Sequence, residues 1–353
     1  MSHPLDIVFL GLCITSSWGN GHATTYRGLV RELTRRGHRV LFLERDRPWY
    51  AENRDLAQSP WGRVELYQTL DELKDRFEPE IRRAALVVVG SYVPEGVAVG
   101  TWVVARARGL TAFYDIDTPV TLERLAAGDC DYLSKDLARR YDLYLSFTGG
   151  PMLGRIEREL GAKRALPLYC GVDVNQYLPE ARETSWDLGY LGTYSEDRQP
   201  IVDRLLIEPA RRWRAGRFVV AGPQYPRNIR WPQNVSRVQH LAPPKHAGFY
   251  SAQRFALNAT RQDMARAGWS PSVRLFEAAA CATPVISDGW AGLEEFFAPG
   301  REILVARSTE EILAFVREMP EAERRRVGEA ARARVLRQHT AGHRAQALEE
   351  YVS

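Results

Sequence analysis

The chain has 353 residues, of which 45% are hydrophobic and 26% are charged, and its formal net charge is +4. This length exceeds one ordinary core and indicates two domains of about 150–200 residues, while the composition excludes a disordered chain. The mildly basic charge suits a phosphate-bearing small molecule, but no compact basic and aromatic stripe supports binding to nucleic acid.

Cysteines and apolar runs bear on the compartment. The four cysteines lie in or beside apolar runs without disulfide or metal-type spacing, which predicts free buried thiols. The first apolar run is short and follows Asp6 rather than a basic region, and no run approaches the ~20 residues of a membrane span. We therefore expect a cytoplasmic protein. For the arginine-rich stretch 321–337 we expect a solvated helix face, with weak membrane association as the alternative.

The first half of the chain alternates apolar runs with helix-like segments. Strands are expected at 6–13, 38–44, 63–68, 84–90, 111–117, 142–147 and 165–171. Helices are expected at 24–36, 69–83, 96–108 and 150–161. Most strand candidates are continuous apolar runs, which are typical of parallel strands covered on both faces. The alternation predicts a doubly wound α/β sheet.

The pattern restarts after a polar, proline-containing segment, 172–185, which we interpret as a linker. The second set of strands is expected at 186–193, 217–222, 237–241, 254–258, 283–288 and 302–306. In open α/β sheets ligands bind beyond the carboxyl ends of the strands, so the chemistry should lie in the loops that follow them.

The first such loop, GNGHAT at 19–24, resembles the start of a dinucleotide-binding Gly-x-Gly-x-x-Gly turn. Glu44 ends the next strand, where a dinucleotide fold contacts its ribose, but Thr24 replaces the third glycine. The glycines bring backbone amides to a helix start, where an anion is favoured. An NAD-dependent oxidoreductase and a tight turn without ligand both stay open, and in the second case His22 is only a hydrogen-bonding residue at the helix start.

The most informative stretch is SPSVRLFEAAACATPVISD, residues 270–288. Ser270 or Ser272 can cap a helix that runs to about residue 281. Glu277 would then lie one to two turns inside this helix, and its carboxylate could accept both protons of a ribose diol. Arg274 and the free amides at the helix start could meet a diphosphate.

Four motifs resemble those of the group 1, family 4-like retaining glycosyltransferases of the GT-B fold. FEAAACATPVISD (276–288) resembles their donor-site signature and YCGVDVNQYLP (169–179) their crossover between domains. GLVRELTRRGHRV (28–40) resembles their first helix and second strand, and GYLGTYSEDRQP (189–200) lies at their phosphate-binding turn. Over nearly its full length the chain is most similar to the CgeB-like branch, to which RQHTAGHRA (337–345) also fits.

The resemblance implies an α/β fold with two Rossmann-like, doubly wound domains facing a central cleft. Residues 1–171 would form the N-terminal acceptor domain, and 186–336 the nucleotide-sugar donor domain. The linker 172–185 would join them, and a C-terminal helix within 337–353 would pack back on the N-terminal domain.

The resemblance also implies the donor site. The residues expected there are Glu277 at the ribose; Gly192, Thr193, Tyr194, Arg198, Arg274 and Ser272 at the diphosphate; Asn258 and Arg261 on the nucleotide side; and Gly19, Asn20, Gly21 and His22 at the donor phosphate or sugar. The chain departs from the family at Trp269, where a second glutamate is usual, and at Thr193, where an arginine is usual. Arg198 or Arg274 would therefore carry more of the phosphate charge.

Acid–base candidates are Asp117, His22 and Asp115. Asp115 and Asp117 alternate along the end of an expected strand, so they would point to opposite sides, and we favour Asp117 because the chain leaves the sheet at Pro119. Asp-x-Asp is also the metal signature of another glycosyltransferase fold. We expect no metal and no cofactor, since positive side chains and helix termini can stabilise the diphosphate instead. Carboxylates that only cap a turn are the alternative.

We conclude from the sequence that the chain is a metal-independent, retaining glycosyltransferase that uses a UDP- or dTDP-sugar. Its acceptor, which could be a natural product, a glycan, a protein or a lipid, is not identified. The alternatives are a nucleotide-sugar epimerase of the GT-B fold, an NAD-dependent oxidoreductase and a non-catalytic sugar-nucleotide-binding module.

Overall fold

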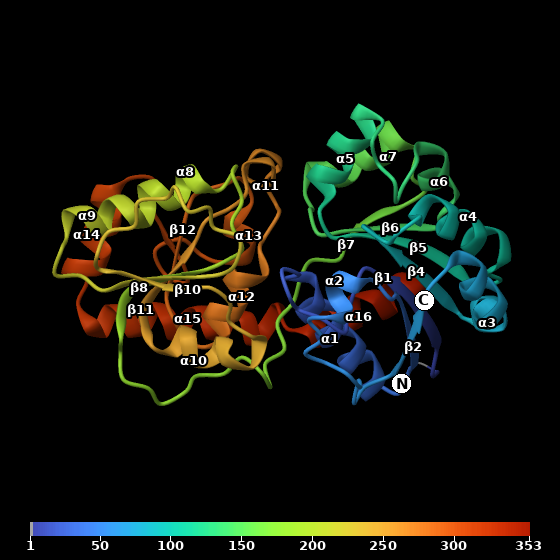
Figure 1. Ribbon diagram of the computed structural model, residues 1–353, viewed down its shortest axis with the longest axis horizontal. Coiled ribbons are helices and arrows are strands. Elements are labelled where there is room, and N and C mark those ends of the chain that lie inside the picture. Colours follow the sequence, from blue (N-terminus) through green and yellow to red (C-terminus); the bar gives the residue numbers. More distant parts are fainter. Residues whose placement is uncertain (1–2) are drawn as a thin grey trace. The chain divides into compact units, whose positions relative to one another are not determined.

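The computed structural model describes residues 3–353, which form two compact units. The first unit extends to Gly171 and also contains Ala341–Ser353, and the second is Val172–Thr340. Each unit is built on one sheet of parallel strands with helices on both faces (Figure 1). The predicted fold class, two doubly wound α/β units with a returning C-terminal helix, is confirmed.

The sheet of the first unit has seven strands in the order β3-β2-β1-β4-β5-β6-β7. The strands are β1 (Asp6–Gly11), β2 (Arg39–Arg45), β3 (Arg63–Tyr67), β4 (Leu86–Gly90), β5 (Leu110–Asp115), β6 (Leu143–Ser146) and β7 (Ala165–Pro167). Each of them overlaps the segment expected as a strand in this half. All residues of the central strand β4 are buried, as its continuous apolar run predicted.

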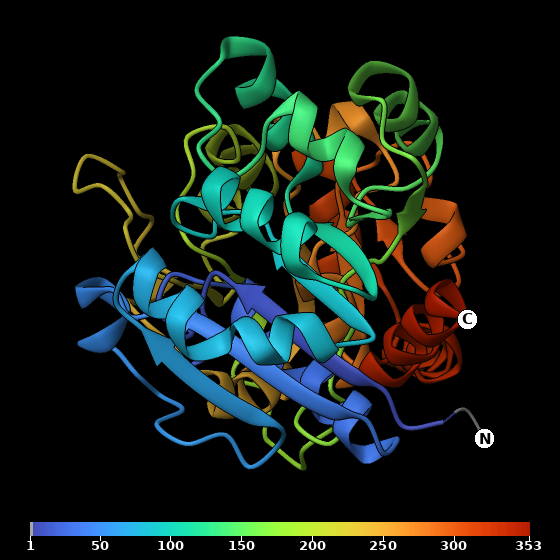
Figure 2. The same ribbon diagram turned by 90° about the vertical axis from the view of Figure 1, so that its right-hand side faces the viewer.

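Helices cover both faces of this sheet. They are α1 (His22–Arg35), α2 (Pro48–Ala51), α3 (Leu70–Arg83), α4 (Gly96–Arg106), α5 (Thr118–Ala127), α6 (Lys135–Arg140), α7 (Pro151–Leu160) and the C-terminal α16 (Ala341–Val352). Figure 2, in which this unit faces the viewer, shows α3 and α4 lying across the strands. Helix α16 packs beside α1 (Figure 1).

Polar contacts fasten α16 to the first unit. Glu349 accepts a hydrogen bond from Arg36 Nε at 2.8 Å and lies 2.7 Å from His38 Nε2. Tyr351 donates its hydroxyl proton to the Pro167 carbonyl at 2.8 Å. The returning helix begins at Ala341, a few residues after the start of the tail segment expected from the sequence.

The sheet of the second unit has six strands in the order β10-β9-β8-β11-β12-β13. The strands are β8 (Trp186–Leu191), β9 (Phe218–Ala221), β10 (Val235–Val238), β11 (Gln253–Asn258), β12 (Val285–Ser287) and β13 (Leu304–Val305). Each overlaps the segment predicted for it.

The helices of the second unit lie in two layers (Figure 1). One layer contains the continuous run α8 (Gln199–Val202), the π-turn η1 (Asp203–Ile207) and α9 (Glu208–Arg212), with α14 (Thr309–Glu318) packed against it. The other contains α10 (His246–Ser251), α12 (Val273–Ala280) and α15 (Glu321–Gln338). The remaining short elements are the 3-10 turn η2 (Pro243–Lys245), α11 (Gln262–Ala267) and α13 (Leu293–Phe296).

Local signals explain where several helices begin. Thr69 caps α3 by accepting the amide proton of Glu72, and acidic residues in the first turn and basic residues in the last complement the helix dipole. Ser308 and Glu311 form a reciprocal capping box at the start of α14. No helix within residues 3–353 combines the length and the apolar character that crossing a membrane requires.

The strand orders define where a ligand would bind. In each sheet the chain runs outward from a central strand, returns, and continues on the other side, so that β1 and β4 are neighbours in one sheet and β8 and β11 in the other. Loops that leave such a pair of strands diverge and open a crevice at their carboxyl ends.

Candidate functional site

Two arginines converge at the carboxyl end of β8 in the second unit. Arg274, on the first turn of α12, is only 8% exposed. Its Nε donates to the Leu191 carbonyl, its Nη1 donates to Asn258 Oδ1 at 2.9 Å, and its guanidinium lies 4.7 Å from the centre of the Tyr190 ring. The side chain is therefore held against the end of the strand by a carbonyl, an amide and an aromatic ring.

Arg198 approaches the same tyrosine from the loop before α8. Its Nη1 donates to the Tyr190 hydroxyl and to the Thr193 carbonyl, both at 3.2 Å, and its buried Nε has no hydrogen-bond partner. Burial opposes the charge, but the Tyr190 phenol and the Asp197 carboxylate outweigh it, so the pKa of Arg198 lies above its ordinary value. The side chain is thus a permanent cation.

Neither arginine forms an ion pair. Among residues 3–353, no carboxylate oxygen lies within 4.0 Å of a guanidinium nitrogen of Arg198 or Arg274, although most other arginines of this unit have such a partner. A buried charge without a counter-ion is costly unless a ligand supplies one. Two such cations beside one strand end fit a diphosphate.

Asn258 positions Arg274. Its side chain is fully buried, and Oδ1 accepts from Arg274 Nη1 at 2.9 Å and from Ser272 Oγ at 2.8 Å. Its Nδ2 donates to Thr260 Oγ1 and Ser287 Oγ at 3.1 and 2.9 Å. An amide has two protons and two acceptor sites, so all are occupied within the protein. The sequence predicts Asn258 on the nucleotide side of the site, and in the structure its side chain anchors Arg274.

Ser272 precedes α12 as its N-cap residue, but its hydroxyl makes no capping hydrogen bond. It donates to Asn258 instead, and so shares the anchoring of Arg274. The helix starts at Val273 and ends at Ala280, close to the predicted range.

Glu277 lies on the second turn of α12 and is 4% exposed. Its Oε2 accepts a hydrogen bond from the Tyr250 hydroxyl at 3.2 Å and lies 4.0 Å from His246 Nδ1. Within the described chain no hydrogen bond or ion pair is made by Oε1. One carboxylate oxygen is thus anchored by the protein, while the other can accept protons from a ligand.

The turn after β8 requires a glycine. A Cβ at Gly192 would lie 2.6 Å from the Tyr190 hydroxyl and 2.8 Å from Arg274 Nη2, which is closer than real Cβ contacts. The Thr193 carbonyl accepts from Arg198, and the Tyr194 amide donates to the Pro223 carbonyl at 3.1 Å. The turn therefore lies against both guanidinium groups.

Arg261 stands apart from this pair. Its Nε donates to Asp197 Oδ2 at 3.4 Å, and the same oxygen accepts from the Gln262 amide at 3.2 Å. These residues border a pocket of about 740 Å³ between α8 and α11. The carboxylate of Asp197 forms an ion pair with Arg261, whereas it acts on Arg198 only from a longer distance.

The opening loop of the first unit is organised by a buried carboxylate. Glu44 is 0% exposed and accepts hydrogen bonds from the Ile14 amide at 2.7 Å, the Thr15 amide at 3.0 Å and the Thr15 hydroxyl at 2.6 Å. In a dinucleotide-binding fold this acid would contact a ribose. Here its oxygens are used inside the protein, which argues against the oxidoreductase interpretation.

The glycine-rich part of this loop leads into α1. Gly19 has a φ of 59°, in the left-handed region that favours glycine, and both Gly19 and Gly21 are exposed. Asn20 is buried, donates to the Cys13 and Ser16 carbonyls, and accepts from the His22 amide at 3.1 Å. The side chain of Asn20 therefore shapes the turn, and the exposed backbone of the two glycines is the part that can face a ligand.

Asp115 is a buried residue at the end of β5. Tyr144 donates to its Oδ2 at 2.5 Å, and Thr121 and the Asp117 amide donate to its Oδ1 at 2.7 and 3.3 Å. Burial raises the pKa of Asp115 to about 6, against the lowering effect of these hydrogen bonds. With 0% exposure it ties the strand end to α5, a role close to the turn-capping alternative.

Asp117 lies two residues further on, where the chain has left the sheet, and is half-buried. Tyr92, in the loop after β4, donates to its Oδ2 at 3.0 Å. The His22 ring lies nearly parallel to the Tyr92 ring, with centroids 6.2 Å apart and a 12° interplanar angle. The structure thus brings His22 and Asp117 to the two sides of one tyrosine at the β1/β4 crevice, whereas Asp115 stays in the sheet.

Two tyrosines in these places were not singled out from the sequence. Tyr190 supports both arginines, and Tyr92, with a left-handed φ of 64°, orients Asp117. Each lies at or just past the carboxyl end of a predicted strand. Ligands bind at such strand ends in a doubly wound sheet, so a tyrosine hydroxyl there could have been recognised from the sequence as a candidate site group.

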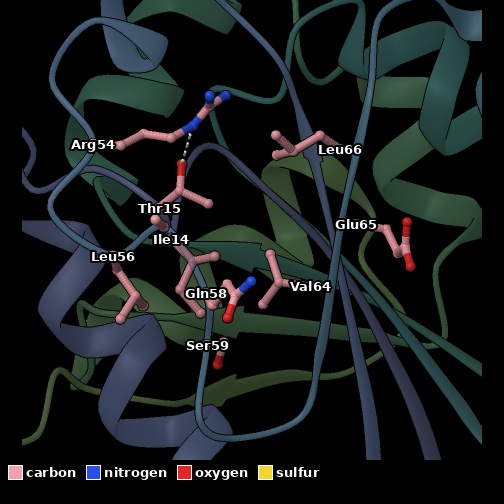
Figure 3. Close-up of a pocket in the computed structure, with 10 residues that line it drawn as sticks. Ile14, Thr15, Arg54, Leu56, Gln58, Ser59, Val64, Glu65 and Leu66 are labelled. Atoms are coloured by element: carbon pink, nitrogen blue, oxygen red, sulfur yellow. Dashed lines mark hydrogen bonds between the residues drawn. The ribbon is translucent and has the colours of Figure 1, made fainter.

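A separate pocket of about 660 Å³ lies in the first unit beside β3. It is lined by Ile14, Thr15, Arg54, Leu56, Ala57, Gln58, Ser59, Val64, Glu65 and Leu66. Figure 3 shows Val64 and Leu66 on one side of the strand and the Glu65 carboxylate on the other. Arg54 donates to Thr15 at 3.4 Å and pairs with Asp46, so its charge is already compensated.

The described residues offer a metal few ligands. Within residues 3–353, no group of three or more histidine, cysteine, aspartate or glutamate side chains is arranged to hold an ion. The donor set beside Tyr190 consists of guanidinium groups, which repel a cation and attract an anion.

Comparisons with known proteins bear on the family and the fold. Residues 198–350 match the model of a family described as Glycosyl transferase-like. HepE from Anabaena, solved in complex with UDP and glucose, aligns with a TM-score of 0.72 at 13% identity over 99% of both chains. Sucrose-phosphate synthase from Thermosynechococcus elongatus aligns with a TM-score of 0.69 at 15% identity over 98% of both chains.

An alpha-glucosyltransferase (AGT), solved in complex with UDP, aligns with a TM-score of 0.71 at 11% identity over 99% of both chains. No curated protein matches the sequence. The family match over residues 198–350 agrees with the expectation of an enzyme of the glycosyltransferase class, and the structural matches over the whole chain confirm the GT-B fold.

Proposed function

We propose that the protein transfers a sugar from a nucleoside-diphosphate sugar to an acceptor hydroxyl or amine. One arrangement carries this proposal: two cations, the buried Arg274 and the half-buried Arg198, lie in the same unit as Glu277, whose Oε1 is open. Cations of this kind suit a diphosphate, and a carboxylate oxygen on α12 suits the two hydroxyls of a ribose.

Transfer of the sugar leaves negative charge on the diphosphate. As the bond between the anomeric carbon and the phosphate oxygen breaks, its electron pair stays on the leaving diphosphate. In this proposal Arg198 and Arg274 stabilise that charge, because donors fixed in place before the reaction need no reorganisation when the charge develops. The same positive side chains support a reaction without a metal ion.

The donor is proposed to be a UDP- or dTDP-sugar. HepE has been solved in complex with UDP-glucose and the alpha-glucosyltransferase with UDP, which favours uridine as the first base to test. The motifs around Glu277 and Gly192, together with the segment 337–345, further support membership of the CgeB-like branch.

Acceptor activation is proposed to involve Asp117 or His22. The acceptor oxygen forms the new bond to the anomeric carbon, and its proton passes to one of these groups or to the departing phosphate. Asp117 suits this role better than Asp115, because Asp117 is half-buried in a loop while Asp115 is enclosed by hydrogen bonds. The resemblance to retaining enzymes favours transfer with retention.

A ligand screen followed by turnover tests the proposal. Thermal-shift measurements with UDP, dTDP, GDP, ADP and NAD(H) should show a higher melting temperature with UDP or dTDP. Stabilisation by NAD(H) alone would replace the transferase with an oxidoreductase. The matching UDP- or dTDP-sugars are then incubated with acceptor mixtures, and release of UDP that depends on the acceptor separates transfer from epimerisation.

Two further measurements test the finer claims. Turnover should persist in EDTA, and its loss with recovery on adding Mg²⁺ or Mn²⁺ would overturn metal independence. NMR of the first product should show the anomeric configuration of the donor, and the opposite configuration would make the enzyme inverting.

A further inference from the structure

A tyrosine in the loop after β9 holds one peptide group of the turn between β8 and α8. The Tyr225 hydroxyl donates a hydrogen bond to the Gly192 carbonyl at 3.2 Å. Burial raises the pKa of Tyr225 above its ordinary value, so the phenol keeps the proton that it donates. The carbonyl belongs to the peptide group that joins Gly192 to Thr193, and the contact therefore fixes the oxygen end of that group.

Neighbouring side chains hold the Tyr225 ring in place. The guanidinium of Arg237, on β10, lies 4.1 Å from the centre of this ring and 4.3 Å from the centre of the Trp231 ring. Arg237 Nη2 also donates to the Gly222 carbonyl at 3.3 Å. The Tyr194 ring meets the Tyr225 ring edge-on, with centroids 5.5 Å apart. These contacts fasten the loop that contains Tyr225 both to β10 and to the turn.

The backbone at Gly222 packs against the same peptide group. Gly222 has a φ of 144°, and a Cβ there would lie 2.0 Å from the Gly192 carbonyl oxygen. Any side chain at this position would therefore push the oxygen away from the Tyr225 hydroxyl. The close approach of Gly222 and the hydrogen bond from Tyr225 thus hold the peptide group in one orientation.

One amide of the turn is left open. In the part of the chain that the structure describes, the Gly192 and Tyr194 amides donate to backbone carbonyls at 2.8 and 3.1 Å, whereas the Thr193 amide and hydroxyl make no hydrogen bond. The C=O and N–H bonds of a trans peptide group point in opposite directions. The Thr193 N–H is therefore directed away from Tyr225, and Thr193 is partly exposed.

We propose that Tyr225 is a positioning residue that points the Thr193 amide proton at a phosphate oxygen of the bound nucleoside diphosphate. This inference rests on the proposed function and adds a backbone donor to the two guanidinium groups. An N–H that is fixed before the ligand binds needs no reorganisation, and its hydrogen bond to a charged oxygen is stronger than one to a neutral group. Tyr225 does not touch the ligand in this scheme, so its effect should depend on the presence of phosphate.

Calorimetry with UDP and uridine tests this dependence. Tyr225→Phe keeps the ring against Arg237 and removes only the hydroxyl, so it should weaken UDP binding about threefold to tenfold and leave uridine binding unchanged. Tyr351→Phe, which also removes a hydroxyl bonded to a backbone carbonyl, should leave both affinities unchanged. Equal losses for UDP and uridine in the Tyr225 variant, or no loss for either ligand, would overturn the positioning role.

NMR observes the amide directly. In protein labelled with isotopic nitrogen at its threonines, the Thr193 signal can be assigned by its loss in Thr193→Ser. This signal should move downfield when UDP binds and stay in place with uridine, and in Tyr225→Phe the movement at saturating UDP should be smaller. A wild-type protein that binds UDP without any change of the Thr193 signal would overturn the amide contact and leave the proposed function intact.

A second substitution separates the backbone of Thr193 from its side chain. Thr193→Ala removes the hydroxyl and keeps the amide, so Tyr225→Phe should weaken UDP binding by the same factor in this background as in the wild type. Disappearance of the Tyr225 effect there would assign the contact to the hydroxyl and overturn the role of the amide. A wild-type protein that binds no nucleoside diphosphate would overturn the proposed function together with this inference.

Discussion

The guanidinium of Arg274 lies 4.7 Å from the centre of the Tyr190 ring, and the hydroxyl of the same tyrosine accepts a hydrogen bond from Arg198. One aromatic residue thus supports two cations, one through its face and one through its oxygen. Both contacts favour the charged form without neutralising it. A carboxylate in this place would have held the arginines as firmly but would have cancelled the charge that a diphosphate needs.

Replacement of Glu277 should remove the ribose contact. We expect Glu277→Ala to weaken UDP binding at least about tenfold, the scale of hydrogen bonds to a charged group. Calorimetry on the variant measures this, and Glu318→Ala on α14, an exposed helix glutamate, serves as the matched control. Unchanged affinity would mean that the ribose lies elsewhere.

Arg198 should contribute specifically to the diphosphate. We expect Arg198→Ala to weaken UDP binding about 10–100-fold and uridine binding hardly at all, because only the nucleotide carries phosphate charge. The fold should persist, since Arg198 is bonded only to Tyr190 and Thr193. Arg211→Ala, an exposed arginine on α9, is the control, and a parallel loss for uridine would contradict a phosphate role.

Gly192→Ala should disturb both arginines without changing any charge. The new Cβ would press on the Tyr190 hydroxyl and Arg274 Nη2, so we expect a stability loss of about 1–3 kcal/mol and weaker UDP binding. Chemical denaturation and calorimetry measure the two effects. Gly154→Ala on α7, whose Cβ would meet only the flexible end of Arg158, should be neutral or slightly stabilising. A Gly192 variant that behaves like it would show that the turn can relax without cost.

Asp115 should make stability fall as pH rises. Its pKa is raised from 3.8 to about 6 in the folded protein, so the folded state binds the proton more tightly than the unfolded chain. Its contribution is therefore fully present below pH 3.8 and lost as the pH rises through about 6. Between pH 4 and 7 the wild type should lose about 2–3 kcal/mol relative to Asp115→Asn. Urea unfolding at several pH values tests this, and parallel curves for the two proteins would contradict it.

Glu349 should act in the opposite direction. Hydrogen bonds from Arg36 lower its pKa from 4.5 to about 2, partly opposed by burial and assisted by His38. Its contribution is present above pH 4.5 and is lost as the pH falls through about 2. At pH 7 we expect Glu349→Gln to lower the melting temperature by roughly 2–4 °C. The difference should vanish near pH 2, and Glu350→Gln, an exposed neighbour, should show no such pH dependence.

Much of the fold follows from local patterns in the chain. Continuous apolar runs located the strands, and the start of α12 and the position of Glu277 within it follow from a serine, a proline and the apolar residues after them. Gly192 was recognisable only through the resemblance of its segment to a phosphate-binding turn. These features depend on residues that are close together in the sequence, so the sequence alone is enough to predict them.

The amino-acid sequence by itself therefore determined two doubly wound units and the strand ends at which the site residues lie. Only the tertiary structure decided what each polar group does there. Asn258 and Glu44 use their hydrogen-bonding groups mostly on residues 14 to 31 positions away, while Arg198, Arg274 and Glu277 keep part of theirs open. Asp115 and Asp117 differ by two positions, yet Asp115 is enclosed by Tyr144 and Thr121, whereas Asp117 lies in a loop and accepts a hydrogen bond from Tyr92. The physical reason is that a polar group can bind a ligand only with those hydrogen-bonding positions that the protein does not already use. Partners distant in the sequence are brought to a polar group only by folding.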